Sequence, residues 1–192
     1  MITMITFLFA PRQTLIIKSL LIILLLAIPA NKAFAEDQKV KVRITGLFSP
    51  ERELDLRQIM EQWPDIKLTN LDFNYAEAVL TFDSVKLFQK ATPDQVLTRL
   101  DEKMRSLTQG TFGIKPVSTT PREKLIQVEI LVAGLDCKAC CLAAYEIVAK
   151  IEGVEQATSS FKAGRITALI DPQKTQKPVL EAALKQRGVV LK

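Results

Sequence analysis

The sequence predicts an α+β protein made of two consecutive copies of one β–α–β–β–α–β unit, preceded by an export signal. Three observations predict this fold class. The first 35 residues are apolar and contain no acidic residue. The rest of the chain repeats its hydrophobic pattern at a spacing of 88 residues without a gap. Within each copy, apolar residues alternate as in strands and then recur at the i, i+3, i+4, i+7 spacing of a helix.

Residues 1–35 have the features of a secretory signal peptide. They carry three basic residues, and their apolar stretch, from Ser19 to Ala30, is shorter than the roughly 20 residues that a membrane span needs. Residues 33–35, Ala-Phe-Ala, have the small-residue spacing of a cleavage site. We therefore expect an exported protein, periplasmic if the source is a Gram-negative bacterium. The alternative is an inner-membrane anchor formed by an uncleaved signal.

The composition after residue 35 excludes several classes of function. Residues 36–192 carry 23 basic and 21 acidic side chains, and no basic run is interleaved with aromatic residues, so no nucleic-acid partner is expected. No contact with a membrane is expected once the signal is cleaved. The chain has no histidine, which excludes Ser–His and Cys–His catalysis and histidine-ligated metal sites. No catalytic residue is predicted, and we do not expect an enzyme.

The first copy is expected over residues 38–117. Alternation of apolar and polar residues predicts its strands, and apolar residues at helical spacing predict its helices. Thr92, Pro93 and Gln95 supply an N-cap, a first-turn proline and a capping-box partner for the second helix. The expected elements are strands at 39–46, 66–73, 76–83 and 111–115 and helices at 50–63 and 93–107. The expected buried face of the second helix consists of Leu97, Leu100, Met104 and Leu107.

The second copy is expected over residues 124–192, after a linker at 118–123 that is rich in Ser, Thr and Pro. Its expected elements are strands at 125–133, 154–161, 164–170 and 189–191 and helices at 138–151 and 178–187. The order in both copies is the ferredoxin-like arrangement. The chain is thus expected to contain two tandem ferredoxin-like domains.

All three cysteines lie within five residues, at the predicted turn from the first strand of the second copy to its first helix. Residues 134–141 are Gly-Leu-Asp-Cys-Lys-Ala-Cys-Cys, so Cys137 and Cys140 form a CxxC at a helix start. The N-terminus of a helix favours negative charge, so we expect it to lower the thiol pKa, with Lys138 adding to the effect. Thiolates select soft metal ions. This clustering predicts a site rather than a disulfide framework.

This segment resembles the Gly-Met-x-Cys-x-x-Cys motif of heavy-metal-associated (HMA) domains. That family includes copper chaperones, periplasmic mercury-binding proteins and the amino-terminal domains of heavy-metal ATPases. The resemblance covers residues 124–192 strongly and, through the repeat, residues 38–117 weakly. It implies a βαββαβ fold, one soft metal ion held by Cys137 and Cys140, and a metallochaperone or sequestration role. A membrane metal transporter is the implied delivery partner.

Two residues depart from the commonest form of the motif and bear on the choice of metal. Asp136 stands where copper- and mercury-handling members often have Thr, and it resembles the domains of zinc, cadmium and lead exporters. A carboxylate is a hard oxygen ligand, so it favours Zn(II) or Cd(II) over linear Cu(I) or Hg(II). Cys141 is a candidate third thiolate, or a small residue packed on the helix. Two thiolates suffice for Cu(I) or Hg(II) and are too few for a closed zinc site.

The first copy lacks these ligands. Ser49 and Arg52 stand where the second copy has Cys137 and Cys140. Neither replaces a thiolate, and we expect no metal there. Ser49 is expected to act as an ordinary helix N-cap. The first copy is then either a structural spacer or a docking surface for a partner that its sequence does not identify.

Two other functions compete with metal binding. A CxxC at a helix start also serves thiol–disulfide redox proteins, and an oxidising compartment favours a Cys137–Cys140 disulfide. Against this alternative, the flanking Trp and Gly-Pro of thioredoxin-like motifs are missing. The other alternative is an interaction domain with a vestigial site, since the first copy shows that ligands can be lost.

Overall fold

A computed structural model describes residues 37–89 and 91–192 of the chain. The predicted signal peptide, residues 1–35, lies outside the described residues. None of the helices in the described part is both long and apolar enough to cross a membrane. The two copies, residues 38–117 and 124–192, are called the first and second repeat below.

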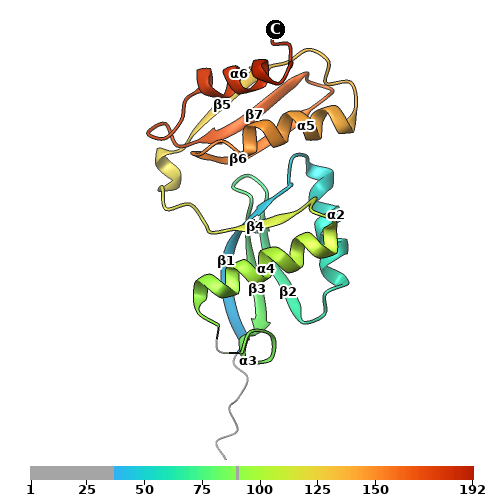
Figure 1. Cartoon of the computed structure of the whole chain (residues 1–192), viewed down its shortest axis with the longest axis vertical. Helices are drawn as coiled ribbons and strands as arrows, with labels where there is room; N and C mark the ends of the chain where they lie inside the picture. Colours follow the sequence, from blue (N-terminus) through green and yellow to red (C-terminus); the bar gives the residue numbers. More distant parts are fainter. Residues whose placement is uncertain (1–36, 90) are drawn as a thin grey trace, which may run out of the picture. The chain divides into compact units, whose positions relative to one another are not determined.

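The first repeat is a four-stranded antiparallel sheet with helices on one face (Figure 1). The strands occur in the order β2-β3-β1-β4, so the first and third strands lie in the centre. The helices α2 and α4 contribute to one core with the inward side chains of β1 and β3. The elements are β1 (Asp37–Thr45), α2 (Pro50–Glu61), β2 (Ile66–Asp72), β3 (Glu77–Asp83), α3 (Ser84–Leu87), α4 (Pro93–Thr108) and β4 (Gly113–Lys115).

The second repeat has the same topology (Figure 1). Its strands are ordered β5-β7-β6, and an isolated antiparallel bridge between Val132 and Leu191 adds the end of the chain beside β5. The 3₁₀ turn η1 (Arg122–Lys124) leads from the linker into the repeat. The elements that follow are β5 (Ile126–Leu131), α5 (Lys138–Ala149), β6 (Val154–Ser160), β7 (Arg165–Ile170) and α6 (Lys177–Gln186). The predicted α+β class with two ferredoxin-like units is confirmed.

The buried face of α4 agrees with the prediction at Leu100 and Met104, includes Leu97 only in part, and differs at Leu107. Val96, Leu100, Met104 and Thr108 are buried at i, i+4, i+8 and i+12, whereas Leu107 remains 39% exposed. Thr108 can be buried because its hydroxyl donates to the carbonyl of Met104 at 2.8 Å and accepts from a backbone N–H at 3.1 Å. A polar residue whose hydrogen bonds are satisfied therefore occupies the place that hydropathy assigned to a leucine.

Two further local features differ from the expectation. The short helix α3 was not expected; Asp83 caps it by accepting a hydrogen bond from the Lys86 N–H at 2.9 Å. The expected strand at 189–191 is only a bridge at Leu191. Beside this bridge, the Ala133 N–H donates to the Val190 carbonyl and the Lys192 N–H donates to the Leu131 carbonyl.

The capping box of α4 yields a first prediction. Thr92 Oγ1 accepts from the Gln95 N–H, and Gln95 Oε1 accepts from the Thr92 N–H at 3.0 Å. Thr92→Ala should destabilise the first repeat by about 1 kcal/mol, the usual cost of a lost N-cap. Urea unfolding followed by the fluorescence of Trp63, the single tryptophan, which is buried in this core, measures the change. Ser106→Ala, at an exposed position within the same helix, is the control and should not lower stability. An unchanged midpoint for Thr92→Ala would contradict the prediction.

Candidate metal centre

The cysteine loop, residues 134–140, connects the end of the first strand of the second repeat to α5. Gly134 begins it with a positive φ of 75°, a conformation that glycine adopts readily. Leu135 then points into the core of the repeat and is 5% exposed. Asp136 and Cys137 are exposed. The buried leucine fixes the loop to the core, and the residues after it are presented to solvent.

Cys137 is the N-cap of α5, and its sulfur takes the place of a capping oxygen. Its backbone is extended, with φ −147° and ψ 162°, and its Sγ accepts a hydrogen bond from the Cys140 N–H at 3.1 Å. Both cysteines are free thiols; Cys137 is exposed and Cys140 half-buried. The start of the helix therefore holds the two sulfurs of the CxxC on the same turn, at the surface.

The two thiols have opposite pKa shifts. A hydrogen bond from the Cys140 thiol, and after it one from the Cys140 backbone N–H, lowers the pKa of Cys137. The thiol that donates this bond must give up a bonded proton beside a negative sulfur, so the pKa of Cys140 is raised. The lowering expected at a helix start is therefore found at Cys137 and reversed at Cys140. Asp136 opposes the lowering at Cys137, and Lys138 is not among its causes.

The other two predicted ligands are placed differently from the CxxC pair. Cys141 is 2% exposed and packs in the hydrophobic core of the second repeat. Asp136 is exposed and precedes Cys137 in the loop. In residues 37–89 and 91–192, no three Cys, Asp or Glu side chains converge on one point where a metal ion could sit. The structure thus brings Cys137 and Cys140 together, and the participation of Asp136 and Cys141 stays a prediction.

The equivalent loop of the first repeat has the same backbone but different chemistry. Ser49 is the N-cap of α2 with φ −149° and ψ 159°, within a few degrees of Cys137. As expected it occupies the cap position, but its hydroxyl bonds the side chain of Glu51 instead of a helix N–H, and this bond lowers the pKa of Glu51. Arg52, the counterpart of Cys140, forms an ion pair with Asp55 at 2.7 Å. The guanidinium of Arg52 therefore puts a positive charge where the second repeat has its second thiol, Cys140.

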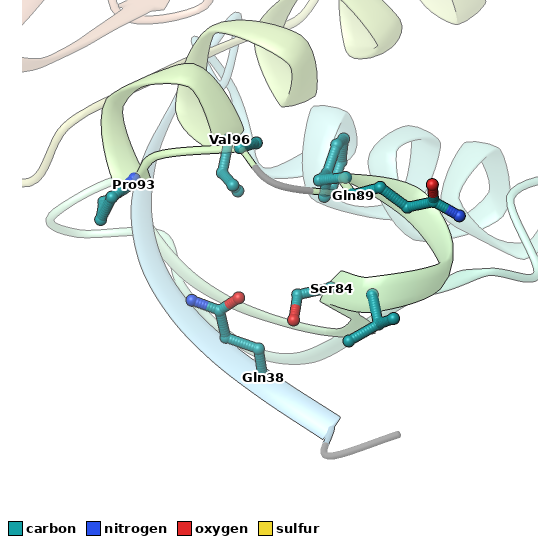
Figure 2. A pocket seen from close by; sticks show the side chains of 8 residues that line it. Gln38, Ser84, Gln89, Pro93 and Val96 are labelled. Carbon is teal, nitrogen blue, oxygen red and sulfur yellow. The ribbon is translucent and has the colours of Figure 1, made fainter. Parts of the chain in front are cut away.

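A separate hollow of about 380 Å³ lies at the far end of the first repeat, between β1, α3 and the start of α4 (Figure 2). Gln38 and Ser84 border it together with apolar side chains such as Phe88 and Val96. Its lining residues in the described part of the chain include no thiol and no charged group. It therefore offers none of the ligands that a soft metal ion needs.

Comparison with known proteins gives matches among solved structures only. No family model matches the chain, and no curated protein matches it. Oxidized MerP from Ralstonia metallidurans CH34 is 26% identical over 35% of this chain and 97% of its own, with a TM-score of 0.33. The CopZ metallochaperone is 22% identical over 35% of this chain and all of its own, with a TM-score of 0.34.

A third match extends over more than either repeat. The N-terminal soluble domains of Bacillus subtilis CopA are 17% identical over 82% of this chain and 94% of their own, with a TM-score of 0.33. The chain is thus similar to MerP and to CopZ over about a third of its length, and to the N-terminal soluble domains of CopA over most of it.

Proposed function

We propose that this chain is an exported heavy-metal-binding protein that holds one soft ion between Cys137 and Cys140, as a metallochaperone or a sequestering protein. The observation that carries the proposal is the position of Cys137 Sγ, which caps α5 through the Cys140 N–H at 3.1 Å while both thiols remain free. We further propose that residues 38–117 and 124–192 are separate domains joined by the linker 118–123. The first of these is a degenerate domain without metal ligands.

The donor set determines which ions fit. Two thiolates form a nearly linear site that satisfies Cu(I) or Hg(II) and leaves a Zn(II) or Cd(II) ion open to further ligands. Asp136 is exposed beside the pair and can supply an oxygen to the latter ions. We propose that the ion is cargo, because an exposed two-ligand site lets an incoming thiolate bind before the first ligands leave. A membrane metal transporter is the partner that we propose for this exchange.

Binding of the ion releases protons, because each ligand must be a thiolate. The lowered pKa of Cys137 makes its thiolate available first, and the raised pKa of Cys140 makes its proton the one that the ion must displace. Affinity should therefore rise with pH up to the pKa of Cys140 and level off above it. At lower pH, protons compete with the ion for both sulfurs.

Competition for the site tests the proposal. The reduced chain 36–192, prepared without oxygen, is offered Zn(II), Cd(II), Cu(I) and Hg(II) together, and bound ions are identified by native mass spectrometry. We expect one ion per chain, absent from the Cys137→Ser, Cys140→Ser double variant. If Zn(II) or Cd(II) is the ion bound in this competition, the result supports Asp136 as a ligand. If Cu(I) or Hg(II) is bound, Asp136 is not needed as a ligand. Equal binding by the parent chain and the double variant would refute the proposed function.

One observation favours thiol–disulfide exchange as the second candidate. The pKa of the first thiol is lowered and that of the second is raised, an arrangement that suits a nucleophilic and a resolving cysteine. In that reaction the Cys137 thiolate attacks a substrate disulfide, and Cys140 then closes the Cys137–Cys140 disulfide and releases the substrate as a dithiol. If no ion binds, the reduction potential of the pair is the next measurement.

A further inference from the structure

The loop after β1 of the first repeat, residues 46–49, is buried against the second repeat. We call it the docking loop. Phe48 is 9% exposed and belongs to the hydrophobic core of the second repeat, where its ring lies 5.6 Å from that of Tyr145 on α5. Leu47 is fully buried in the core of its own repeat. Adjacent residues of one loop therefore take part in two different cores.

Hydrogen bonds of the Gly46 N–H and the Phe48 carbonyl fix the docking loop. The Gly46 N–H donates to the Tyr145 hydroxyl at 2.7 Å, and the N–H of Ser159 in β6 donates to the Phe48 carbonyl at 2.9 Å. Gly46 has a φ of +96°, and a Cβ there would lie 2.1 Å from a backbone oxygen, so another residue would not fit. The loop therefore presents one N–H and one C=O, in defined positions, to α5 and β6.

A buried amide of the second repeat adds a third connection. Gln156 is 7% exposed, and its Nε2 donates to the carbonyls of Leu47 at 3.1 Å and Phe73 at 3.0 Å, both in the first repeat. Its Oε1 accepts from the Ala157 N–H at 2.9 Å, which orients the amide. Every polar group of this buried side chain is engaged, and two of its three hydrogen bonds reach the first repeat.

Arg52 supports the docking loop from the first repeat. This residue stands at the position of Cys140, and its guanidinium lies 4.2 Å from the ring centroid of Phe112 and 5.5 Å from that of Phe48. Its Nε donates to the carbonyl of Gly46 at 3.5 Å. The side chain that replaced the second thiol therefore contacts the loop at both Gly46 and Phe48.

The connecting segment is held by both repeats as well. Thr120 donates to the buried carboxylate of Asp171 at 2.7 Å in the second repeat. Arg122 forms ion pairs with Asp72 and Glu77 and stacks on the ring of Tyr75 at 3.8 Å, all in the first repeat. A freely flexible tether would make no such contacts, so the linker fits an arrangement in which the repeats stay together.

We propose that the docking loop is an interaction surface whose partner is the second repeat of the same chain. Its contacts are the Tyr145 face of α5 and the outer edge of β6. The first repeat then holds the helix whose first turn carries Cys137 and Cys140, and its own loop is not free to receive an outside partner. The proposal does not depend on metal binding, because none of these contacts includes Cys137 or Cys140.

Amide hydrogen exchange of the metal-free chain 36–192, resolved by NMR, tests the proposal. The Gly46 and Ser159 amides should be protected in the parent chain. Gln156→Glu places a carboxylate against two carbonyls and should accelerate both amides by about tenfold or more, the loss of about one net hydrogen bond. Gln186→Glu, the same change at an exposed position of α6 in the same repeat, should leave both rates unchanged. Fast Gly46 and Ser159 exchange in the parent chain would overturn the proposal.

A second variant separates undocking from misfolding. Phe48→Ala changes a residue of the first repeat and should accelerate the Ser159 amide of the second, while the Ala168 amide in the centre of its sheet keeps its rate. If Gln156→Glu also accelerates Ala168, the second repeat has been damaged and the result of Phe48→Ala decides. An unchanged Ser159 rate in Phe48→Ala would overturn the proposal.

Discussion

Cys137→Ser and Cys140→Ser should each weaken binding of the preferred soft ion by at least about a hundredfold, whereas Cys141→Ala should leave the affinity unchanged. Structural zinc sites bind with roughly 10–16 kcal/mol shared among four ligands, or about 2.5–4 kcal/mol each, and 1.4 kcal/mol is a tenfold change. Cys141 is 2% exposed and belongs to the core of the second repeat, whereas Cys137 and Cys140 lie at the surface. Competition against a chromophoric chelator measures the three affinities.

Two of these variants, Cys141→Ala and Cys137→Ser, should also differ in stability, and this difference provides the control. Cys141→Ala removes a buried sulfur and should cost about 1–2 kcal/mol of unfolding free energy, at the low end for a truncated core residue. Cys137→Ser keeps a hydrogen-bond acceptor at the N-cap and should cost little. A loss of affinity in Cys141→Ala at a temperature where the variant is folded would contradict this assignment and make Cys141 a third ligand.

Restoring the two missing thiols of the first repeat should create a second site. In the Ser49→Cys, Arg52→Cys double variant, the new cysteines occupy the N-cap and the third residue of α2, as Cys137 and Cys140 do in α5. The backbone angles at Ser49 and Cys137 differ by only a few degrees, so we expect the same convergence of sulfurs. Native mass spectrometry of the reduced chain should then show two bound ions.

A variant with two cysteines that cannot converge controls for non-specific thiol binding. Glu51→Cys with Arg57→Cys puts both thiols on α2 at a spacing that places them on different faces, and it should bind no additional ion. Loss of Arg52 also removes its contacts with Phe48 and Gly46, so the Gly46 amide of the restored variant should exchange faster. One bound ion in the restored variant would show that backbone geometry alone does not make the site.

Much of the fold could be predicted because its signals are local. Alternation in β1 and β5 and the cap at Thr92 depend on residues adjacent in sequence, and the repeat at a spacing of 88 connects the two copies. The CxxC was predicted at a helix start, and Cys137 is the N-cap of α5. Local hydrogen bonding determines such features, so one sequence suffices to find them.

The features that were not predicted depend on contacts between distant residues. Phe48 follows Leu47 in an apolar pair, and nothing local indicates that the two enter different cores. The role of Arg52 depends on Phe112, sixty residues away in the chain. The opposite pKa shifts of Cys137 and Cys140 come from a thiol–thiol hydrogen bond, whereas the sequence indicates only a helix terminus. Hydropathy reports that a side chain is covered but not which element covers it.

The position of β6 at the border of its sheet has a consequence for biosynthesis. An open strand edge is a template for pairing with other chains, and natural proteins protect such edges from aggregation. Here the Phe48 carbonyl covers the Ser159 N–H on the outer side of β6. The first repeat leaves the ribosome, or a translocation channel, before the second, and amino-terminal domains generally fold first. The residue that covers the Ser159 N–H is therefore synthesised before β6, so we expect this contact to be available when that strand forms.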